Sequence, residues 1–599
     1  MSSPTATIHN SAPGTRASRR AATRPWRKQV LMGAPLVLFL LAFLVYPVGQ
    51  LLGLSIYNGQ GFTLEPYRHL FASTLYANVL WITMKISLMT TALAVIGAYP
   101  VAYVISTANP ATKGRLIFWV LLAFWTSFLV RAFAWVVLLG RNGVVNQLLV
   151  SVGILDRPAD LLYNYGAVIL GMAHAMLPLA VMTMLAVMEN IDRSLPRAAS
   201  TLGARPGTAF WTVYFPLSMP GVAAAAIMVF VTAIGFFIVP ALLGGRRETM
   251  ITQLIIDQVQ QTLNWSLAGS ISVLLLAVVL AVFVLYDRVF GFATLTGESA
   301  GAARNRDTAM RRLGARVLAL LGAASDELLR LVPRGRHAGG DRPAPAALRA
   351  FVWVLLILIS VPAFLMIPLS FGSNGLNWPP TGFTLQWYEQ MIQSPVWAQA
   401  LSRSVIVAFG TGILSMLIGV PAAFLMVRSQ MRGKGAMLAF ILSPVVVPRM
   451  IIAVGLFYVF AQMGLVGTVL GMVIGHTVVS VPYVVMTMMA VLRNYDTRLD
   501  LAAQSLGARP MAALRHVTFP ILGAGMLSSF LFAFATSFDE LTIALFSSGG
   551  LNATLPKQFW DEVTLQVSPV IAAVSTCLLI FIAILIFTAD ALRRRSMAR

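Results

Sequence analysis

Twelve apolar stretches, each long enough to cross a lipid bilayer, dominate this sequence. A helix needs about 20 mostly apolar residues to span the hydrocarbon core. Because backbone polar groups in lipid find no water, stretches of this kind are interpreted as helices. The expected fold is therefore an all-α integral membrane protein with twelve transmembrane helices. The stretches cover roughly 30–54, 79–106, 116–140, 166–188, 217–242, 268–290, 350–371, 402–427, 436–462, 468–491, 521–546 and 569–590.

The charge composition agrees with a membrane protein. Only 11% of the residues are charged, whereas a soluble globular chain carries about 25%. The net charge of +22 would suit a nucleic-acid binder, but the charges lie in short loops between apolar stretches, so no nucleic acid is expected as a partner. The lone cysteine, Cys577, lies inside an apolar stretch and forms no internal disulfide.

The distribution of lysine and arginine predicts the orientation. Most of them fall in the basic tail 1–29, in every second loop and in the tail 591–599. Since basic loops stay in the cytoplasm, both tails are expected there. No small-residue cleavage site follows the first apolar stretch, so that stretch is expected to remain as a helix. The expected location is a bacterial inner membrane, crossed many times.

An internal repeat divides the chain. Residues 182–221 and 486–525 are identical at 20 of 40 positions without a gap, at an offset of 304 residues. Six apolar stretches separate the copies, so both lie on the same side of the membrane. This arrangement predicts two parallel, pseudo-symmetric six-helix halves, at 30–290 and 350–590.

The segment 291–349 joins the two halves and contains no apolar span. It carries Gly, Pro and many Arg, which is typical of a fusion linker, and this is the favoured interpretation. In the alternative, residues 308–332 form a basic amphipathic helix that lies on the inner membrane face.

The repeat contains a predicted helix–glycine–helix elbow, at 189–216 in the first half. Asp192 is placed to cap a short helix, Gly203 to end it in a left-handed conformation, and Pro206 to begin a second helix. Pro216 is expected to end that second helix. The small apolar face and the residues around the glycine are Leu195, Ala198, Ala199, Leu202, Ala204, Arg205 and Phe210.

The second half repeats this pattern at 492–520. A small apolar face on a short helix suits docking into a partner's groove. The alternative, a loop that packs only on its own bundle, is disfavoured because the elbow is long and has diverged less than the membrane part. The corresponding residues are Asp496, Leu499, Ala502, Ala503, Leu506, Gly507, Ala508, Arg509, Pro510, Leu514 and Pro520.

The two elbows carry a family resemblance. AASTLGARPGTAFWTVYFP and AAQSLGARPMAALRHVTFP resemble the Glu-Ala-Ala…Gly loop of ABC-type importer permeases. In that family the loop supplies a coupling helix that docks on a cytoplasmic ATPase. The family's glutamate position holds Arg197 in one half and Leu501 in the other, so the specific salt bridge of that glutamate is not expected here.

The resemblance extends over most of both halves. VRAFAWVVLLGRNGVVNQLL looks like one spermidine/putrescine permease subunit, and SFDELTIALF with LPKQFWDEVTLQVSPVIAAVST looks like its partner subunit. The resemblance implies a type I importer fold with a fused pair of permease halves. It also implies that a polyamine is the transported solute.

Partners follow from what the sequence lacks and from the family. No GxxxxGK[ST] phosphate loop is present among the chain's five lysines, so ATP and Mg are expected on a separate cytoplasmic ABC ATPase dimer. A periplasmic solute-binding protein is expected to deliver the small-molecule substrate. The sequence offers no metal-ligand cluster and no nucleophile–base pair, so neither a cofactor on this chain nor an enzyme activity is expected.

Ionisable residues inside membrane spans are candidates for the substrate path, because burying them in lipid is unfavourable. A polycation would favour Asp539 or Glu540, with Phe538 or Trp560 for cation–π contact. A carboxylate-bearing solute would instead favour an arginine. As a further alternative, these charges pair as structural ions. The remaining candidates are Arg131, Arg449, His174 and His476; for the two histidines, capping of a backbone carbonyl is favoured.

Four functions therefore compete. An ABC importer permease for a polyamine is favoured, and the same type of permease for a small anionic solute is the first alternative. A twelve-helix secondary transporter shares the pseudo-symmetry but does not need paired elbows. A membrane-bound enzyme would need a polar catalytic constellation, which the sequence lacks.

Overall fold

The computed structural model describes residues 25–57, 61–290, 309–330, 345–549 and 552–597, and these form helices joined by loops. Within these residues, ten helices are long and apolar enough to cross a membrane, or eleven when one sharply bent pair counts as a single span. Each of the twelve predicted stretches contains a helix, and in the last stretch this helix is α27 (Val570–Met597). The predicted all-α fold is confirmed for the described residues.

The first half begins with a helix that a π-turn interrupts. Its long helices are α1 (Pro25–Leu40), η1 (Leu41–Val45), α2 (Tyr46–Gly53), α4 (Thr74–Thr107), α5 (Pro110–Trp125), α6 (Phe128–Leu139), α8 (Tyr165–Met188), α11 (Phe215–Ile234) and α14 (Trp265–Phe290). Shorter helices connect them: α3 (Glu65–Ala72), α7 (Val144–Ser151), α12 (Ile238–Leu243), η3 (Arg246–Glu248) and α13 (Ile251–Gln260).

The second half follows the same plan. Its long helices are α16 (Ala346–Ser370), α18 (Pro395–Arg428), α19 (Lys434–Val446), α20 (Arg449–Met463), α21 (Val469–Arg493), α24 (Phe519–Phe538) and α27 (Val570–Met597). The shorter helices are α17 (Gln386–Gln393), α25 (Thr542–Ser547) and α26 (Leu555–Leu565).

The third span of each half is broken, whereas the sequence predicted continuous helices over 116–140 and 436–462. In the first half the break lies between α5 and α6, where the Ser127 hydroxyl caps α6 by accepting from the Leu129 amide at 3.2 Å. In the second half α19 and α20 meet at 89°. Pro448 explains that bend, because proline disfavours the α conformation in the residue before it.

The fifth spans are also interrupted. The sequence predicted continuous helices over 217–242 and 521–546, but α11 ends at Ile234 and α24 ends at Phe538. The placement of Asp539 and Glu540 inside a helix was therefore wrong, because both lie in the break before α25. A break of this kind exposes helix ends inside the bundle, and polar side chains are needed there to satisfy them.

The prolines Pro216 and Pro520 do not end helices, contrary to the prediction. Each is the second residue of a long span, α11 or α24, and a π-helical turn precedes it. Proline lacks an N–H and its ring clashes with the carbonyl four residues earlier. A π-turn widens the helix at that point and lets it continue, with a bend, into the membrane span.

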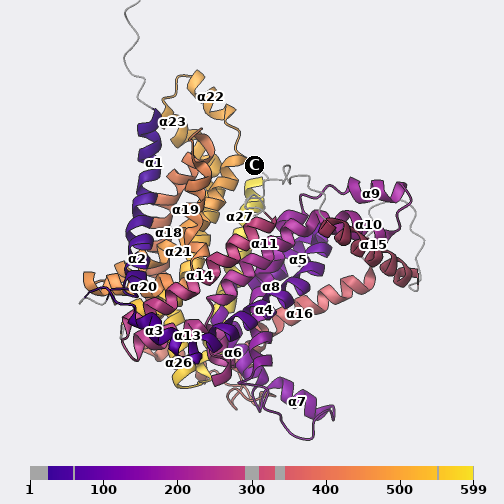
Figure 1. Cartoon of the computed structure of the whole chain (residues 1–599), viewed down its shortest axis with the longest axis vertical. Helices are drawn as coiled ribbons and strands as arrows, with labels where there is room; N and C mark the ends of the chain where they lie inside the picture. The colour runs from indigo at the N-terminus through magenta and orange to yellow at the C-terminus, as the bar shows by residue number, and fades with distance from the viewer. Residues whose placement is uncertain (1–24, 58–60, 291–308, 331–344, 550–551, 598–599) are drawn as a thin grey trace, which may run out of the picture.

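The two halves exchange their first helices. The helices α1 and α2 pack against α18 and α20 of the second half, while α16 packs against α4, α5 and α6 of the first half. Gly455 allows the close approach of α20 to α2, because a Cβ there would lie 2.8 Å from the Pro47 carbonyl oxygen. Figure 1 shows the two bundles joined at one end and diverging toward the other, where α9 and α22 lie. This interlocked frame holds the breaks of both halves at their common boundary.

Candidate functional site

The first elbow has the predicted helix–glycine–helix form. Its first helix is α9 (Ser194–Thr201), and the Asp192 Oδ1 accepts from the Ser194 amide at 2.8 Å. Gly203 has a φ of +90°, so the predicted left-handed conformation is confirmed. Pro206 begins the next helix, α10 (Pro206–Ala209), as predicted. This helix then runs through the π-turn η2 (Phe210–Tyr214) into α11.

The second elbow reproduces this geometry. Its helices are α22 (Arg498–Ser505) and α23 (Pro510–Ala513), which continues through η5 (Leu514–Thr518) into α24. Gly507 also has a φ of +90°. In both elbows the amide of the residue directly before the arginine-proline pair closes the turn in the same way. The Ala204 amide donates to the Ala199 carbonyl at 3.0 Å, and the Ala508 amide donates to the Ala503 carbonyl at 3.0 Å.

Each elbow presents a leucine at its tip. Leu202 and Leu506 are both 89% exposed, and Leu195 and Leu499 are also exposed. Ala198 and Ala502 are exposed beside them. Two matching apolar tips at equivalent places have the character of docking surfaces, since exposed apolar patches typically mark interaction sites.

Other predicted elbow residues have structural contacts. Ala199, Ala503, Ala204 and Ala508 are half-buried within the turns. Phe210 packs edge-on against Tyr103 with ring centroids 5.3 Å apart, so it belongs to the interior of the first half. Arg205 lies 3.6 Å from Glu327 of the linker. The remaining predicted residues are Leu514, which is half-buried, and Asp496 and Arg509, which are exposed.

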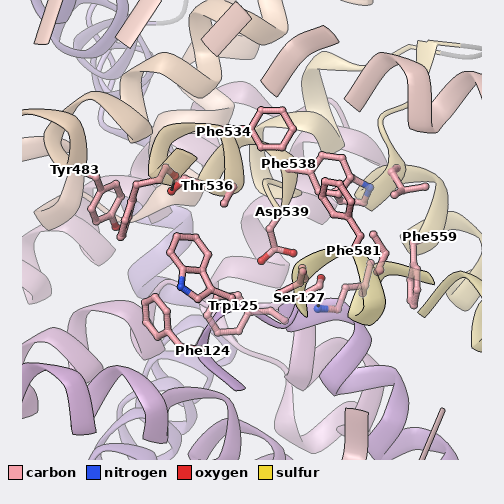
Figure 2. Close-up of a pocket in the computed structure, with 18 of the residues that line it drawn as sticks. Phe124, Trp125, Ser127, Tyr483, Phe534, Thr536, Phe538, Asp539, Phe559 and Phe581 are labelled. Carbon is pink, nitrogen blue, oxygen red and sulfur yellow. Dashed lines mark hydrogen bonds between the residues drawn. The ribbon is translucent and has the colours of Figure 1, made fainter. Parts of the chain in front are cut away.

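A cavity of about 180 Å³ lies where the broken spans of the two halves meet (Figure 2). The first half contributes the end of α5, the start of α6 and Leu179 of α8, and the second half contributes parts of α20, α21, α24, α26 and α27. Aromatic side chains are the most numerous kind in its wall, with one carboxylate and one guanidinium among them. The aromatic residues are Phe124, Trp125, Phe128, Tyr483, Phe532, Phe534, Phe538, Phe559 and Phe581.

Asp539 joins the two halves inside this cavity. Its carboxylate interacts with the side chain of Ser127 and the backbone of Phe128, at the N-terminus of α6. Figure 2 shows Asp539 pointing into the cavity toward Ser127, with Trp125 beside it. The exposed amides of a helix N-terminus stabilise a negative charge. Asp539 is only half-buried, so its carboxylate is available to a molecule in the cavity.

The two arginines are not equivalent, although the sequence placed them at similar depths. Arg449 is the first residue of α20, is exposed and lines the cavity, where it interacts electrostatically with Tyr483, Glu540 and Asp539. Arg131 is the fourth residue of α6 and is 2% exposed. It donates to the Ala175 carbonyl at 3.0 Å and lies over the Phe128 ring. Arg131 therefore contributes to helix packing and does not line the cavity.

Glu540 also has a structural position. It is 1% exposed and accepts from the amides of Thr542 and Ile543 at 3.1 and 2.8 Å, which caps α25. His476 is fully buried, with its Nε2 3.7 Å from the Glu540 carboxylate. Neither arginine forms a direct ion pair with Asp539 or Glu540 among the described residues.

Two further predicted path residues lie away from the cavity. His174 is buried, and its Nε2 donates to the Ile359 carbonyl at 2.9 Å. This is the backbone contact that the sequence analysis favoured for the membrane histidines. Trp560 packs edge-on against Phe237 at 5.3 Å and is not part of the cavity wall. Phe538 is part of it. The described residues contain no group of three His, Cys, Asp or Glu side chains placed to hold a metal ion.

Sequence reasoning missed most of the cavity wall. Trp125, Tyr483 and Phe532 form one aromatic group. The ring centroid of Phe532 lies 5.0 Å from that of Trp125 and 5.2 Å from that of Tyr483. Aromatic residues are common in membrane spans, so nothing in the sequence separated these from ordinary packing residues. The available signals were Ser127 and Pro448, which mark the helix breaks that bring these rings together.

Two interlocked helical halves, matching elbows and a boundary cavity define a permease, the membrane part of a transport system. The chain belongs to the family described as binding-protein-dependent transport system inner membrane component, whose profile matches residues 99–291 and 415–597, one segment in each half. This membership makes it a multi-pass inner membrane protein of an ABC importer, which works with a solute-binding protein and an ATPase. Proteins of this family are transport components and not enzymes.

Curated relatives match each half separately. The spermidine/putrescine transport system permease protein PotB of Haemophilus influenzae is 34% identical over 225 residues, which is 37% of this chain and 78% of the relative. PotC of the same organism is 27% identical over 249 residues, which is 41% of this chain and 96% of the relative. The predicted fusion of two permease subunits agrees with these matches.

One solved structure, of a bacterial ABC transporter that imports the acidic polysaccharide alginate, is also similar. It is 12% identical, covers 45% of this chain and 97% of its own, and has a TM-score of 0.34. A similarity this low supports no conclusion about mechanism or substrate.

Proposed function

We propose that this permease moves a polyamine such as putrescine or spermidine through the cavity at the boundary of its halves. The observation that carries the proposal is the position of Asp539, a half-buried carboxylate in a wall rich in aromatic rings. A polyamine combines ammonium groups with methylene chains. A carboxylate attracts the former, and aromatic faces bind both through cation–π and apolar contacts. The names of the PotB and PotC relatives support the same class of solute.

We further propose that both termini and both elbows lie in the cytoplasm, and that an ATPase dimer docks on the two elbows. The equal exposure of Leu202 and Leu506 supports a pair of equivalent docking sites. Two matching elbows suit a dimeric partner with one groove per subunit. The division into a tail at 1–29, halves at 30–290 and 350–590 and a linker at 291–349 belongs to the same proposal.

Uptake by reconstituted protein tests the substrate. The permease is placed in proteoliposomes with its ATPase and binding protein, and uptake of labelled putrescine is measured with competing solutes. Spermidine is expected to compete, and a small dicarboxylate is expected not to. Competition by the dicarboxylate alone would contradict the proposal.

A second candidate function rests on Arg449, which is exposed in the same cavity. A guanidinium there suits a carboxylate-bearing solute. Asp539 and Glu540 weaken this alternative, because both interact electrostatically with Arg449 and offset its charge. Under this alternative, Arg449→Gln slows uptake of the anionic solute and Asp539→Asn does not.

A further inference from the structure

The second elbow is anchored by its own aspartate. Asp500 of α22 is 9% exposed, and its Oδ1 accepts from the Tyr495 and Thr518 hydroxyls, both at 2.7 Å. Its Oδ2 lies 2.8 Å from Arg428 at the end of α18. One carboxylate therefore ties α22 to the start of α24 and to a second membrane helix.

The first elbow has no such residue at the equivalent place. At the repeat offset of 304, Pro196 corresponds to Asp500, and Ile191 corresponds to Tyr495. The first elbow is tied instead by Arg193, which donates to the Ser106 carbonyl, and by Tyr214, whose hydroxyl lies 3.0 Å from the Ser106 Oγ. The repeat alone thus leaves the first elbow without a buried carboxylate.

The linker between the two halves supplies a buried carboxylate to the first elbow. Residues Ala309–Arg330 form helix α15, which packs against α10 and η2 (Figure 1). Asp326 of α15 is 2% exposed and accepts from the Gly207 amide at 2.6 Å, the Thr208 amide at 3.0 Å and the Thr208 hydroxyl at 2.7 Å. It therefore caps the N-terminus of α10 from a different part of the chain.

The contact between α15 and α10 is close as well as polar. A Cβ on Gly322 would lie 3.0 Å from the Thr208 Cα, so only a glycine allows this approach without a shift. Burial raises the pKa of Asp326, but the hydrogen bonds from Thr208 and Gly207 outweigh it and hold that pKa below its ordinary value. The aspartate is therefore charged at neutral pH, where a helix N-terminus favours it.

The opposite side of α15 carries an apolar stripe. Val317, Leu320, Leu321 and Leu328 are between 41% and 70% exposed. Their spacing places them on one side of a helix, away from Gly322 and Asp326. No described part of the chain covers this stripe.

The level of α15 relative to the membrane and the charge of the linker indicate that lipid covers the apolar stripe. The helix packs beside η2, where Phe210, Trp211 and Tyr214 form an aromatic cluster at the entry to a membrane span. Trp and Tyr concentrate at the membrane–water interface, so η2 marks that level. The linker sequence also carries more arginines than acidic residues, which suits a leaflet with anionic headgroups.

We propose that the linker helix α15 binds the anionic membrane surface with its apolar stripe and anchors the first elbow with Asp326. The linker thereby does for the first half what Asp500 does for the second. It also links the position of one elbow to the lipid surface. The lipid contact of α15 does not depend on the proposed function. The effect of Asp326 on coupling does rest on the proposed function.

Fluorescence in vesicles tests the lipid contact. Cys577 is replaced by Ser, and a fluorophore is attached in the full chain at Leu320→Cys or, as the control, at Ala323→Cys. Both positions are exposed, but Ala323 lies outside the stripe. In vesicles of phosphatidylcholine and phosphatidylglycerol, a lipid-borne quencher is expected to quench the probe at 320 several-fold more than the probe at 323. Equal quenching, or protection of 320 only when the ATPase is added, would overturn the lipid assignment.

Hydrogen exchange tests the anchor. In Asp326→Ala, the amides of Gly207 and Thr208 are expected to exchange about tenfold faster than in the parent, the effect of losing a helix cap. Arg316→Ala is the control, because it removes an exposed charged side chain of the same helix ten residues before Asp326, and the exchange of the two amides is expected to stay near the parent rate. Asp326→Asn keeps one acceptor and is expected to fall between them. Unchanged exchange in Asp326→Ala would refute the anchor.

Coupling is measured separately, as solute taken up per ATP hydrolysed. Asp326→Ala is expected to lower this ratio several-fold, while Arg316→Ala leaves it unchanged. An altered exchange rate with an unaltered ratio would keep the anchor and contradict the role of the first elbow in coupling. Failure of the Asp326 anchor and failure of the elbow's role in coupling therefore give different results.

Discussion

Replacing the glycine of each elbow by valine tests the docking model most directly. Gly203 and Gly507 both have a φ of +90°, which side-chain-bearing residues rarely adopt. A Cβ at either position would meet no atom within 4 Å, so the substitution causes no clash. The whole effect of Gly203→Val or Gly507→Val therefore comes from the backbone conformation.

The magnitude follows from that conformation. A left-handed residue with a side chain costs about 1–2 kcal/mol, and a β-branched residue lies at the upper end. At about 2 kcal/mol, the native elbow becomes roughly 30-fold less populated relative to alternative turns. In the proposed docking model only the native elbow binds the ATPase, so the apparent affinity for the ATPase is expected to fall by a similar factor when the alternative turns dominate.

Co-purification and a binding titration of the ATPase in detergent measure this loss. The matched controls are Gly114→Val and Gly435→Val, since these glycines lie in α5 and α19, have no positive φ and are equally open. Both controls are expected to bind the ATPase as the parent does. Normal binding and transport by both elbow variants would refute the reasoning.

Three further predictions concern energy source, path and pH. Uptake in proteoliposomes at constant ATP is expected to persist when a protonophore collapses the proton gradient, and its loss would favour a secondary transporter. Asp539→Asn is expected to slow amine uptake about tenfold with normal expression. Glu540→Gln is expected to lower the free energy of unfolding by about 1–3 kcal/mol, because the amide keeps only one of the two oxygens that cap α25. The reverse pattern would exchange their roles. Burial raises the pKa of Asp500, but hydrogen bonds from Tyr495 and Thr518 and the charge of Arg428 hold it below its ordinary value. A depressed pKa means that this anchor is present at neutral pH and weakens as the pH falls through the folded-state pKa, so exchange of the α22 amides is expected to accelerate in acid. An Asp500→Asn variant is expected to lose this pH dependence.

The elbows were largely predictable because local chemistry defines them. Glycine at a left-handed position, proline at a helix start and an aspartate near the cap act over a few residues, and the repeat showed them twice. The predicted ends at Pro216 and Pro520 failed for a reason that is also local. A π-turn before each proline absorbs its missing hydrogen bond, and no residue pattern distinguished that outcome from a helix end.

The path residues were predictable only as candidates. Arg131, Arg449, Asp539 and Glu540 all stood out because charge in a span is rare. Their roles separated only when the helix breaks were known. A shift of a few residues relative to a break placed Arg449 in the cavity and buried Arg131 against Ala175.

The sequence by itself determined the membrane class, the two parallel halves and the elbows, because hydrophobic length, repeat spacing and turn chemistry are written in consecutive residues. Only the tertiary structure decided which charge faces the cavity and that Asp326 of the linker caps a helix more than a hundred positions earlier. Contacts of that kind depend on how whole helices pack, and packing joins residues whose separation along the chain carries no local signal.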